Sequence, residues 1–352
     1  MKSQLYTNFV TLFFLSLTIT QTESTYQILN DWKGSDLHPN NEKGWEFYTY
    51  PDPTHGSVNY GKHLDLINEV DGGKIRIDVQ HNIDQGQQNR NSIRINTKET
   101  YDYGLFVIKA EHMPSGLATW PAYWLSGSET YGAWPCFGEI DIIEGVNSVK
   151  SNPKSSINAC TLHTTEGCTQ NGVKGIINTN CNLGQPGNCG CDRKSICPYT
   201  GCGVKFQDTT TFGDGFNSIG GGVYAMELTK DGKITIWFFP NNKVPTDIET
   251  NTPNPSSWGR NYIMADFNSC PGHFKNLKLI INTTLCGDWA GNTYDDGNGN
   301  KGMVQCNLAI RDARYKMDEA YWVINYIKVF KQKDTKVTVD NLKYLSNNID
   351  NL

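Results

Sequence analysis

Short apolar runs of strand length, separated by turn residues, recur along this chain and constrain its fold more than any other feature. The runs cover residues 44–50, 74–80, 92–97, 104–113, 222–229, 233–240, 276–284 and 321–330. Asp-Gly turns at 71–73 and 231–233 punctuate them, and no stretch has a convincing helical period. Because a half-apolar sheet must cover its apolar face with another sheet, we expect an all-β fold. The specific prediction is a jelly-roll sandwich of two curved antiparallel sheets.

The two ends of the chain differ in character from its middle. Lys2 precedes an apolar run from Phe9 to Ile19, which is too short to span a bilayer comfortably. We expect residues 1–24 to be a secretory signal peptide, with a retained membrane anchor as the alternative, and the mature chain to be secreted. No repeat or Pro/Ser linker divides the remainder, so residues 25–330 are predicted to form one domain and residues 331–352 a polar tail.

The cysteines and the charge limit the partners of the chain. Eleven Cys in an exported protein predict disulfides and leave at least one thiol unpaired, for which we expect Cys136. The run from Cys181 to Cys202 has no CxxC pair and no His inside it, which favours a disulfide-stapled loop over a zinc site. A net charge of -5 without basic blocks argues against nucleic acid or membrane partners. No oligomerisation signal is present, so we expect a monomer.

The segment GEIDIIEGVN, residues 138–147, places three carboxylates among β-branched residues typical of a buried strand. In a regular strand Glu139 and Asp141 share one face and Glu144 lies on the other. A β-bulge at Ile142 and Ile143 would return Glu144 to the first face. Paired carboxylates about 5 Å apart are what a retaining glycosidase needs, and a third acid between them can keep one ionised and the other protonated. A solvated acidic edge strand is the alternative interpretation.

The chain resembles glycoside hydrolase family 16 in the bulged, laminarinase-like form of the fungal endo-β-1,3(4)-glucanases. Its acidic strand reads ExDxxE, and the resemblance extends over nearly all of residues 25–330, the predicted catalytic domain. Further matching segments are DPTHGSVNYG (52–61), TWPAYWL (119–125), TLHT (161–164), YAMELT (224–229), IWFFP (236–240), PSSWG (255–259), INTTLCGDWAG (281–291) and EAYWVINYIKVF (319–330). Two features depart from the family, Cys136 with Phe137 ahead of the strand and a longer stretch between Glu144 and His163.

The resemblance implies a role for each of several residues along an open substrate groove. Glu139 would be the nucleophile, Asp141 its assistant and Glu144 the general acid/base. The residues expected to bind substrate are His163, Trp124, Trp134, Trp258, Asn59, and one of Arg90 or Arg94, with Arg94 preferred. A core position for His163 is the alternative.

Other motifs carry weaker predictions. Trp120 is equally compatible with core and groove, whereas Trp237, Trp289 and Trp322 are expected to pack. The loop DDGNGNKG (295–302) fails the EF-hand pattern, since Lys301 and Asn307 replace the required Gly and Glu. No metal or cofactor is expected, although family members sometimes hold a structural calcium for which no ligands can be named here. Asn282 begins an NTT sequon in a strand-like segment.

The resemblance implies a secreted endo-β-glucanase that hydrolyses internal β-1,3 bonds with retention, through a covalent glycosyl-enzyme, with mixed β-1,3/1,4 bonds as a second candidate linkage. A cell-wall glucan transglycosylase would use the same intermediate with a sugar acceptor. A non-catalytic β-glucan recognition protein on the same fold would have lost the glutamates that remain here. Another β-polysaccharide, such as galactan or agar, is a further alternative substrate.

Overall fold

The computed structural model describes residues 25–131, 134–165, 167–170, 182–183, 201–206 and 208–333. The predicted signal peptide and nearly all of the predicted tail lie outside these residues, as do Cys181, Cys189, Cys191 and Cys197 of the predicted stapled loop. Among the helices in the described ranges, none combines the length and the apolar composition needed to cross a bilayer.

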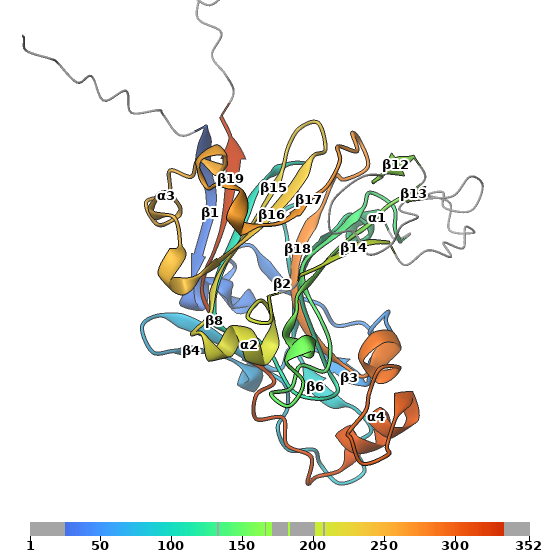
Figure 1. Cartoon of the computed structure of the whole chain (residues 1–352). Coiled ribbons are helices and arrows are strands. Elements are labelled where there is room, and N and C mark those ends of the chain that lie inside the picture. Colours follow the sequence, from blue (N-terminus) through green and yellow to red (C-terminus); the bar gives the residue numbers. More distant parts are fainter. Residues whose placement is uncertain are drawn as a thin grey trace, which may run out of the picture.

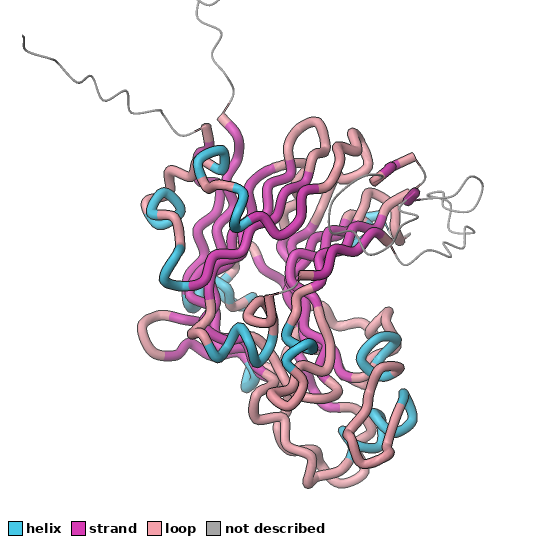
Figure 2. The backbone as a smooth tube through the Cα atoms, in the orientation of Figure 1, coloured by secondary structure: helices cyan, strands magenta, loops and turns pink. Residues whose placement is uncertain are grey.

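Two antiparallel sheets make up the body of the protein (Figures 1 and 2). Within the described residues, the first sheet has the order β17 (Ile263–Asp266), β16 (Ile234–Pro240), β15 (Gly222–Leu228), β8 (Gly104–His112), β19 (Tyr321–Gln332), β5 (Lys74–Asp78), β4 (Ile67–Val70), with β1 (Tyr26–Lys33) also paired to β19. The second has the order β14 (Cys202–Lys205), β11 (Ala159–His163), β10 (Glu139–Glu144), β9 (Thr119–Ser126), β18 (Lys278–Leu285), β7 (Arg94–Thr97), β2 (Trp45–Phe47). The predicted all-β jelly-roll sandwich is confirmed.

Smaller elements lie around the sheets. In the described part of the chain, two further strand pairs join β3 (Val58–Tyr60) to β6 (Arg90–Ser92) and β12 (Cys168–Thr169) to β13 (Asn182–Leu183). The helices are α1 (Ser128–Tyr131), α2 (Gly213–Ser218), α3 (Thr246–Glu249), α4 (Gly302–Arg311) and the π-helix η8 (Gly287–Gly291). The 3-10 turns are η1 (Gly34–Leu37), η2 (Pro39–Asn41), η3 (Leu64–Leu66), η4 (Pro153–Ser156), η5 (Asn241–Lys243), η6 (Pro255–Ser257) and η7 (Arg260–Tyr262).

The main core lies between the two sheets. Alternate residues of each sheet point inward, for example Phe106 and Ile108 of β8 and Leu279 and Ile281 of β18, and all four are essentially inaccessible to solvent. A second apolar cluster covers the outer face of the first sheet, where α3 and η6 pack on β15 and β16. The outer face of the second sheet remains for the polar side chains of β10 and its neighbours.

The structure departs from the sequence predictions in one strand and one helix. Strand β19 continues to Gln332, two residues past the predicted domain end, because Lys331 and Gln332 pair with Gln27 and Tyr26 of β1. The ten-residue helix α4 was not predicted from the sequence. Its exposed residues include Val304 and Leu308, so apolar side chains on both faces of the helix obscure the helical period.

Candidate active site

Strand β10 lies between β9 and β11 in the second sheet. Asp141 pairs with Trp124 of β9, and Ile143 pairs with the next residue, Tyr123, which leaves Ile142 without a counterpart. Ile140, Ile142 and Ile143 all belong to the core between the sheets. The extra residue is therefore a β-bulge at the predicted position, and it restores Glu144 to the face that carries the other two acids.

The turn before β10 needs a glycine. Gly138 has a φ of 81°, and a Cβ atom at this position would come within 2.3 Å of a Phe274 ring carbon. The chain can therefore enter β10 from the turn at Pro135–Gly138 only without a side chain at Gly138. Cys136 in this turn is disulfide-bonded and buried, so the prediction of a free thiol there is wrong. Its distance along the sequence from other cysteines did not reflect its surroundings in the fold, and Cys160 is instead a buried free thiol.

Each acid of the trio has a neighbour that fixes it. Trp134 Nε1 donates to Glu139 Oε2 at 3.1 Å, and Trp120 Nε1 donates to Glu144 Oε1 at 2.9 Å. His163 Nε2 lies 3.4 Å from Asp141 Oδ2 and 3.9 Å from Glu139 Oε1. His163 is directly opposite Glu139 in the β10–β11 pairing, which explains why the two side chains share one face.

Burial controls the protonation of the trio. Desolvation raises the pKa of Glu139, as does the charge of Asp141, whereas His163 and the Trp134 hydrogen bond oppose this rise. Desolvation also raises the pKa of Asp141. The pKa of Glu144 is raised to about 8, by desolvation first and by Asp141 second, against the Trp120 hydrogen bond. Burial and mutual repulsion therefore oppose ionisation of all three acids at once, so a carboxyl proton donor can stay beside a carboxylate nucleophile.

Trp124 extends the site along the sheet. Its Nε1 donates to Asn282 Oδ1 at 2.8 Å, and the Arg94 guanidinium lies 5.0 Å from its ring. Only 2% of the Arg94 side chain is exposed, and its Nη2 lies 2.6 Å from Glu129 Oε1. Arg94 therefore supports the Trp124 ring and does not offer its guanidinium to a ligand, contrary to the expectation of a direct sugar contact.

Arg90, the alternative to Arg94, is not part of the site. Its guanidinium donates to the backbone carbonyls of Gln80, His81, Ile310 and Tyr315, with Asp312 O at 3.4 Å. It joins chain segments far from the acids. Asn59 is exposed on β3, where its side chain bonds to Asn89 and Asn91, so its predicted ligand contact stays a prediction.

Trp258 does not lie near the acids, and its predicted role in substrate binding is wrong. It is 6% exposed, stacks edge-on against Trp237 and Phe239, and donates to Asp247. These residues form the cluster on the outer face of the first sheet, whereas the acids belong to the second sheet. The sequence motif carried no information on which sheet the η6 turn would cover. Trp237 and Trp322 are buried, as predicted.

Trp289, which was predicted to pack, lies partly exposed beside Trp120 at the candidate site. Its ring meets that of Trp120 edge-on, with the centroids 5.8 Å apart, and it is only partly buried. Trp120 itself contacts Glu144, which places it at the site and not in the core. The WPAYW spacing could have indicated that Trp120 lies at the site, since residues 120 and 124 of one strand share a face.

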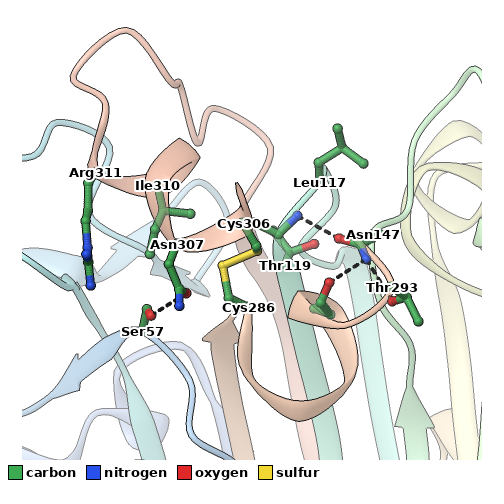
Figure 3. The surroundings of a disulfide bond; sticks show 12 residues. Ser57, Leu117, Thr119, Asn147, Cys286, Thr293, Cys306, Asn307, Ile310 and Arg311 are labelled. Atoms are coloured by element: carbon green, nitrogen blue, oxygen red, sulfur yellow. Dashed lines mark hydrogen bonds between the residues drawn. A yellow bond between two sulfur atoms is a disulfide. The ribbon is translucent and has the colours of Figure 1, made fainter. Parts of the chain in front are cut away.

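The π-helix that carries Trp289 is held from two sides (Figure 3). The Cys286–Cys306 disulfide joins its start to α4, and Asn147 donates to Ala290 O at 2.9 Å. Figure 3 also shows Asn147 bonded to Thr293 on one side of the disulfide and Ser57 bonded to Asn307 on the other. The position of Trp289 beside Trp120 is thus fixed by covalent and polar contacts.

The glycosylation sequon and the possible metal site both lie in this region of the second sheet. Asn282 of the sequon is buried, and its Nδ2 donates to Tyr60 Oη at 3.1 Å, which leaves no room for a glycan in the folded protein. Among the described residues, Glu139, Asp141 and His163 bring ligand-type atoms within 4.8 Å of one another, a spacing that could hold a metal ion. The expectation that no metal is required stays a prediction.

A sandwich with three carboxyl groups on a bulged strand, each beside an indole or imidazole ring, defines a carbohydrate-active enzyme of the β-sandwich class. The model of the XgeA-like catalytic GH16 domain matches residues 45–330, so the chain belongs to glycoside hydrolase family 16.

Curated relatives agree with this family. An endo-1,3(4)-beta-glucanase of Arthroderma benhamiae is 36% identical over 82% of this chain and 62% of its own length. A probable glycosidase of Schizosaccharomyces pombe is 33% identical over 87% of this chain and 70% of its own length. A probable endo-1,3(4)-beta-glucanase of Neosartorya fischeri is 36% identical, and the chain spans less than half, 46%, of its length.

Solved structures agree on the fold. A GH16 laminarinase from Phanerochaete chrysosporium, with beta-glucans in donor and acceptor sites, superposes with a TM-score of 0.69 at 32% identity, over 87% of this chain and 99% of its own. An elongating GH family 16 beta-1,3-glucosyltransferase gives a TM-score of 0.71 at 30% identity, over 87% of this chain and 100% of its own.

Proposed function

We propose that this chain is an endo-acting β-1,3(4)-glucanase that cleaves internal glucosidic bonds with retention of configuration. The observation that carries the proposal is the bulge that brings Glu144 to the same face as Glu139 and Asp141. The indole hydrogen bonds to Glu139 and Glu144 support it. The endo-1,3(4)-beta-glucanases among the relatives support it as well. The partner is accordingly a β-glucan polysaccharide or oligosaccharide.

The reaction would follow two displacements. Glu139, as carboxylate, attacks the anomeric carbon while the carboxyl proton of Glu144 passes to the departing glycosidic oxygen. Water then attacks the anomeric carbon of the glycosyl-enzyme, Glu144 takes a proton from that water, and Glu139 leaves as carboxylate. Asp141 lies between them in sequence, and its charge raises the pKa of both glutamates. Once one carboxylate of the trio is ionised, its charge opposes the loss of further protons, so Glu144 keeps its proton while a neighbouring acid is ionised.

The trio assignment is tested by Glu139→Gln. The variant should lose turnover on laminarin while its melting temperature and circular dichroism remain those of a folded protein. Activity close to wild type would refute the role of Glu139. Proton NMR of the products should show the β-anomer first, and an initial α-anomer would exclude a double displacement.

Reducing-sugar release from laminarin, barley mixed-linkage glucan and agarose tests the substrate class. We expect release from laminarin and from the mixed-linkage glucan. Release from agarose alone would contradict the proposal.

A glucan glucosyltransferase is the second candidate, because one structural relative is an elongating enzyme of this kind. It would use the same Glu139 ester with a sugar hydroxyl in place of water. Product sizing on laminari-oligosaccharides separates the two, since the main products of a transferase include chains longer than the donor, whereas those of a hydrolase are shorter.

Export is proposed from two features. The apolar run at residues 9–19 fits a signal peptide, and the disulfides Cys168–Cys270 and Cys286–Cys306 suit an oxidising compartment. Expression of the full chain with a C-terminal tag should place a shortened protein in the medium. Retention of full-length protein in the membrane fraction would indicate an anchor.

A further inference from the structure

The bulge leaves two backbone groups of β10 without a strand partner on the β11 side. Pairing between β10 and β11 ends at Asp141 with Thr161, one residue before the bulge. The carbonyl of Ile142 follows in a buried position, and the N–H of Glu144 in a partly buried one. A buried backbone group without a hydrogen bond costs about 1–3 kcal/mol, so both need partners.

One side-chain amide supplies both partners. Asn158, directly before β11, accepts from Glu144 N at 2.9 Å through Oδ1 and donates from Nδ2 to Ile142 O at 2.9 Å. Cys160 adds a weaker contact, with its Sγ 3.3 Å from Ile142 O. The amide orientation is fixed by chemistry, because the flipped amide would point a donor at an N–H and an acceptor at a carbonyl.

The scaffold around Asn158 is itself held in place. Asn158 is fully buried, and its own N–H donates to Thr211 Oγ1 at 3.0 Å. The Thr211 hydroxyl in turn donates to Asp208 O at 2.8 Å, and Tyr224 Oη donates to Thr211 O at 2.6 Å. The amide is thus a rigid part of the fold and not a mobile surface group.

We propose that Asn158 is a positioning residue that maintains the bulge and thereby places Glu144 for proton donation. Asn158 fixes the backbone of Glu144 from one side, while Trp120 fixes its carboxyl group from the other. Without the amide, β10 could form a regular strand by shifting one residue, which would turn Glu144 to the opposite face. This inference rests on the proposed role of Glu144 as general acid.

The test compares two substrates in Asn158→Ala. Laminarin needs a proton on its leaving oxygen, whereas a 2,4-dinitrophenyl β-laminarioside has a leaving group that departs without one. General acid catalysis contributes about 10²–10⁴-fold, so we expect kcat on laminarin to fall about 100-fold with KM within about twofold. The kcat/KM of the aryl substrate, which reports the first displacement, should fall less than about fivefold, since that step does not use the proton.

Asn217 offers a matched control. Its amide likewise bridges a backbone N–H and a carbonyl, both of Met113, at 2.9 and 3.0 Å, but it serves the end of β8 in the other sheet. Asn217→Ala should lower the melting temperature as Asn158→Ala does and leave both kcat values unchanged. If Asn158→Ala does not fold, Asn158→Asp retains the shape and the acceptor oxygen, with an expected loss of about tenfold on laminarin only.

The outcomes separate the two proposals. Equal losses on both substrates in the variant that folds, or no loss on laminarin, would overturn the role of Asn158 while leaving the glucanase assignment intact. A wild-type protein that is inactive on both substrates would overturn the proposed function, and this inference with it.

Discussion

Replacing Glu144 with Gln should stabilise the folded protein at neutral pH and leave its stability unchanged in acid. Burial raises the pKa of this carboxyl from 4.5 to about 8 in the folded state. Between these two values the unfolded chain has released the proton that the folded chain retains. The unfolded state therefore binds fewer protons, and the free energy of unfolding falls as pH rises.

The size of the effect follows from that interval. Each pH unit between the two pKa values lowers the wild-type stability by about 1.4 kcal/mol. Gln has no proton to lose, and the Trp120 indole can still donate to its amide oxygen. We expect the variant and the wild type to match near pH 4, and the variant to be more stable by about 4 kcal/mol at pH 8.

Urea unfolding of both proteins at pH 4.5, 6 and 7.5 measures this difference. Glu99→Gln is the control, because Glu99 is exposed and its neutralisation should give no such trend. The reasoning fails if the stability difference between Glu144→Gln and wild type is constant across this range, or if it grows toward acid. Either result would mean that the Glu144 carboxyl is not desolvated as its position in β10 indicates.

Three further changes test other parts of the structure. Trp120→Phe removes a hydrogen bond that lowers the pKa of Glu144, so the basic limb of the kcat/KM profile on laminarin should move to higher pH. We also expect kcat to fall about tenfold. A basic limb at the wild-type pH would contradict this role of Trp120. Trp258→Ala should lower the free energy of unfolding by about 3–5 kcal/mol without changing KM, and a raised KM would return Trp258 to the substrate site. Replacing Cys286 and Cys306 by Ala should cost about 3 kcal/mol in denaturant titrations, because the bond closes a loop with a sequence separation of 20; unchanged stability would show that this loop is not restrained by the bond.

The sequence predicted the acidic strand well because the relevant information is local. Ile140, Ile142 and Ile143 record which side of β10 faces the core, and their spacing already implies one extra residue. The face on which Trp124 lies follows from the same period of two. In these cases neighbouring residues determine the result.

Predictions failed where the answer depends on distant parts of the chain. Trp258 follows a proline-rich turn, and only the path of the whole chain decides that this turn covers the first sheet. Arg94 has a charged side chain that sequence reasoning assigns to the surface, yet Glu129 and two aromatic rings enclose it. The disulfide of Cys136 likewise depends on tertiary proximity, which spacing along the chain does not report.

The neighbours of β19 have a consequence for biosynthesis. This last strand pairs with β8, β5 and β1, so the first sheet stays divided until residues 321–332 have left the ribosome. Contacts between such remote parts of a chain form slowly, because a long loop must close before they stabilise anything. A nascent chain therefore remains without its complete first sheet until β19 has emerged, a state compatible with threading through a translocation pore before folding.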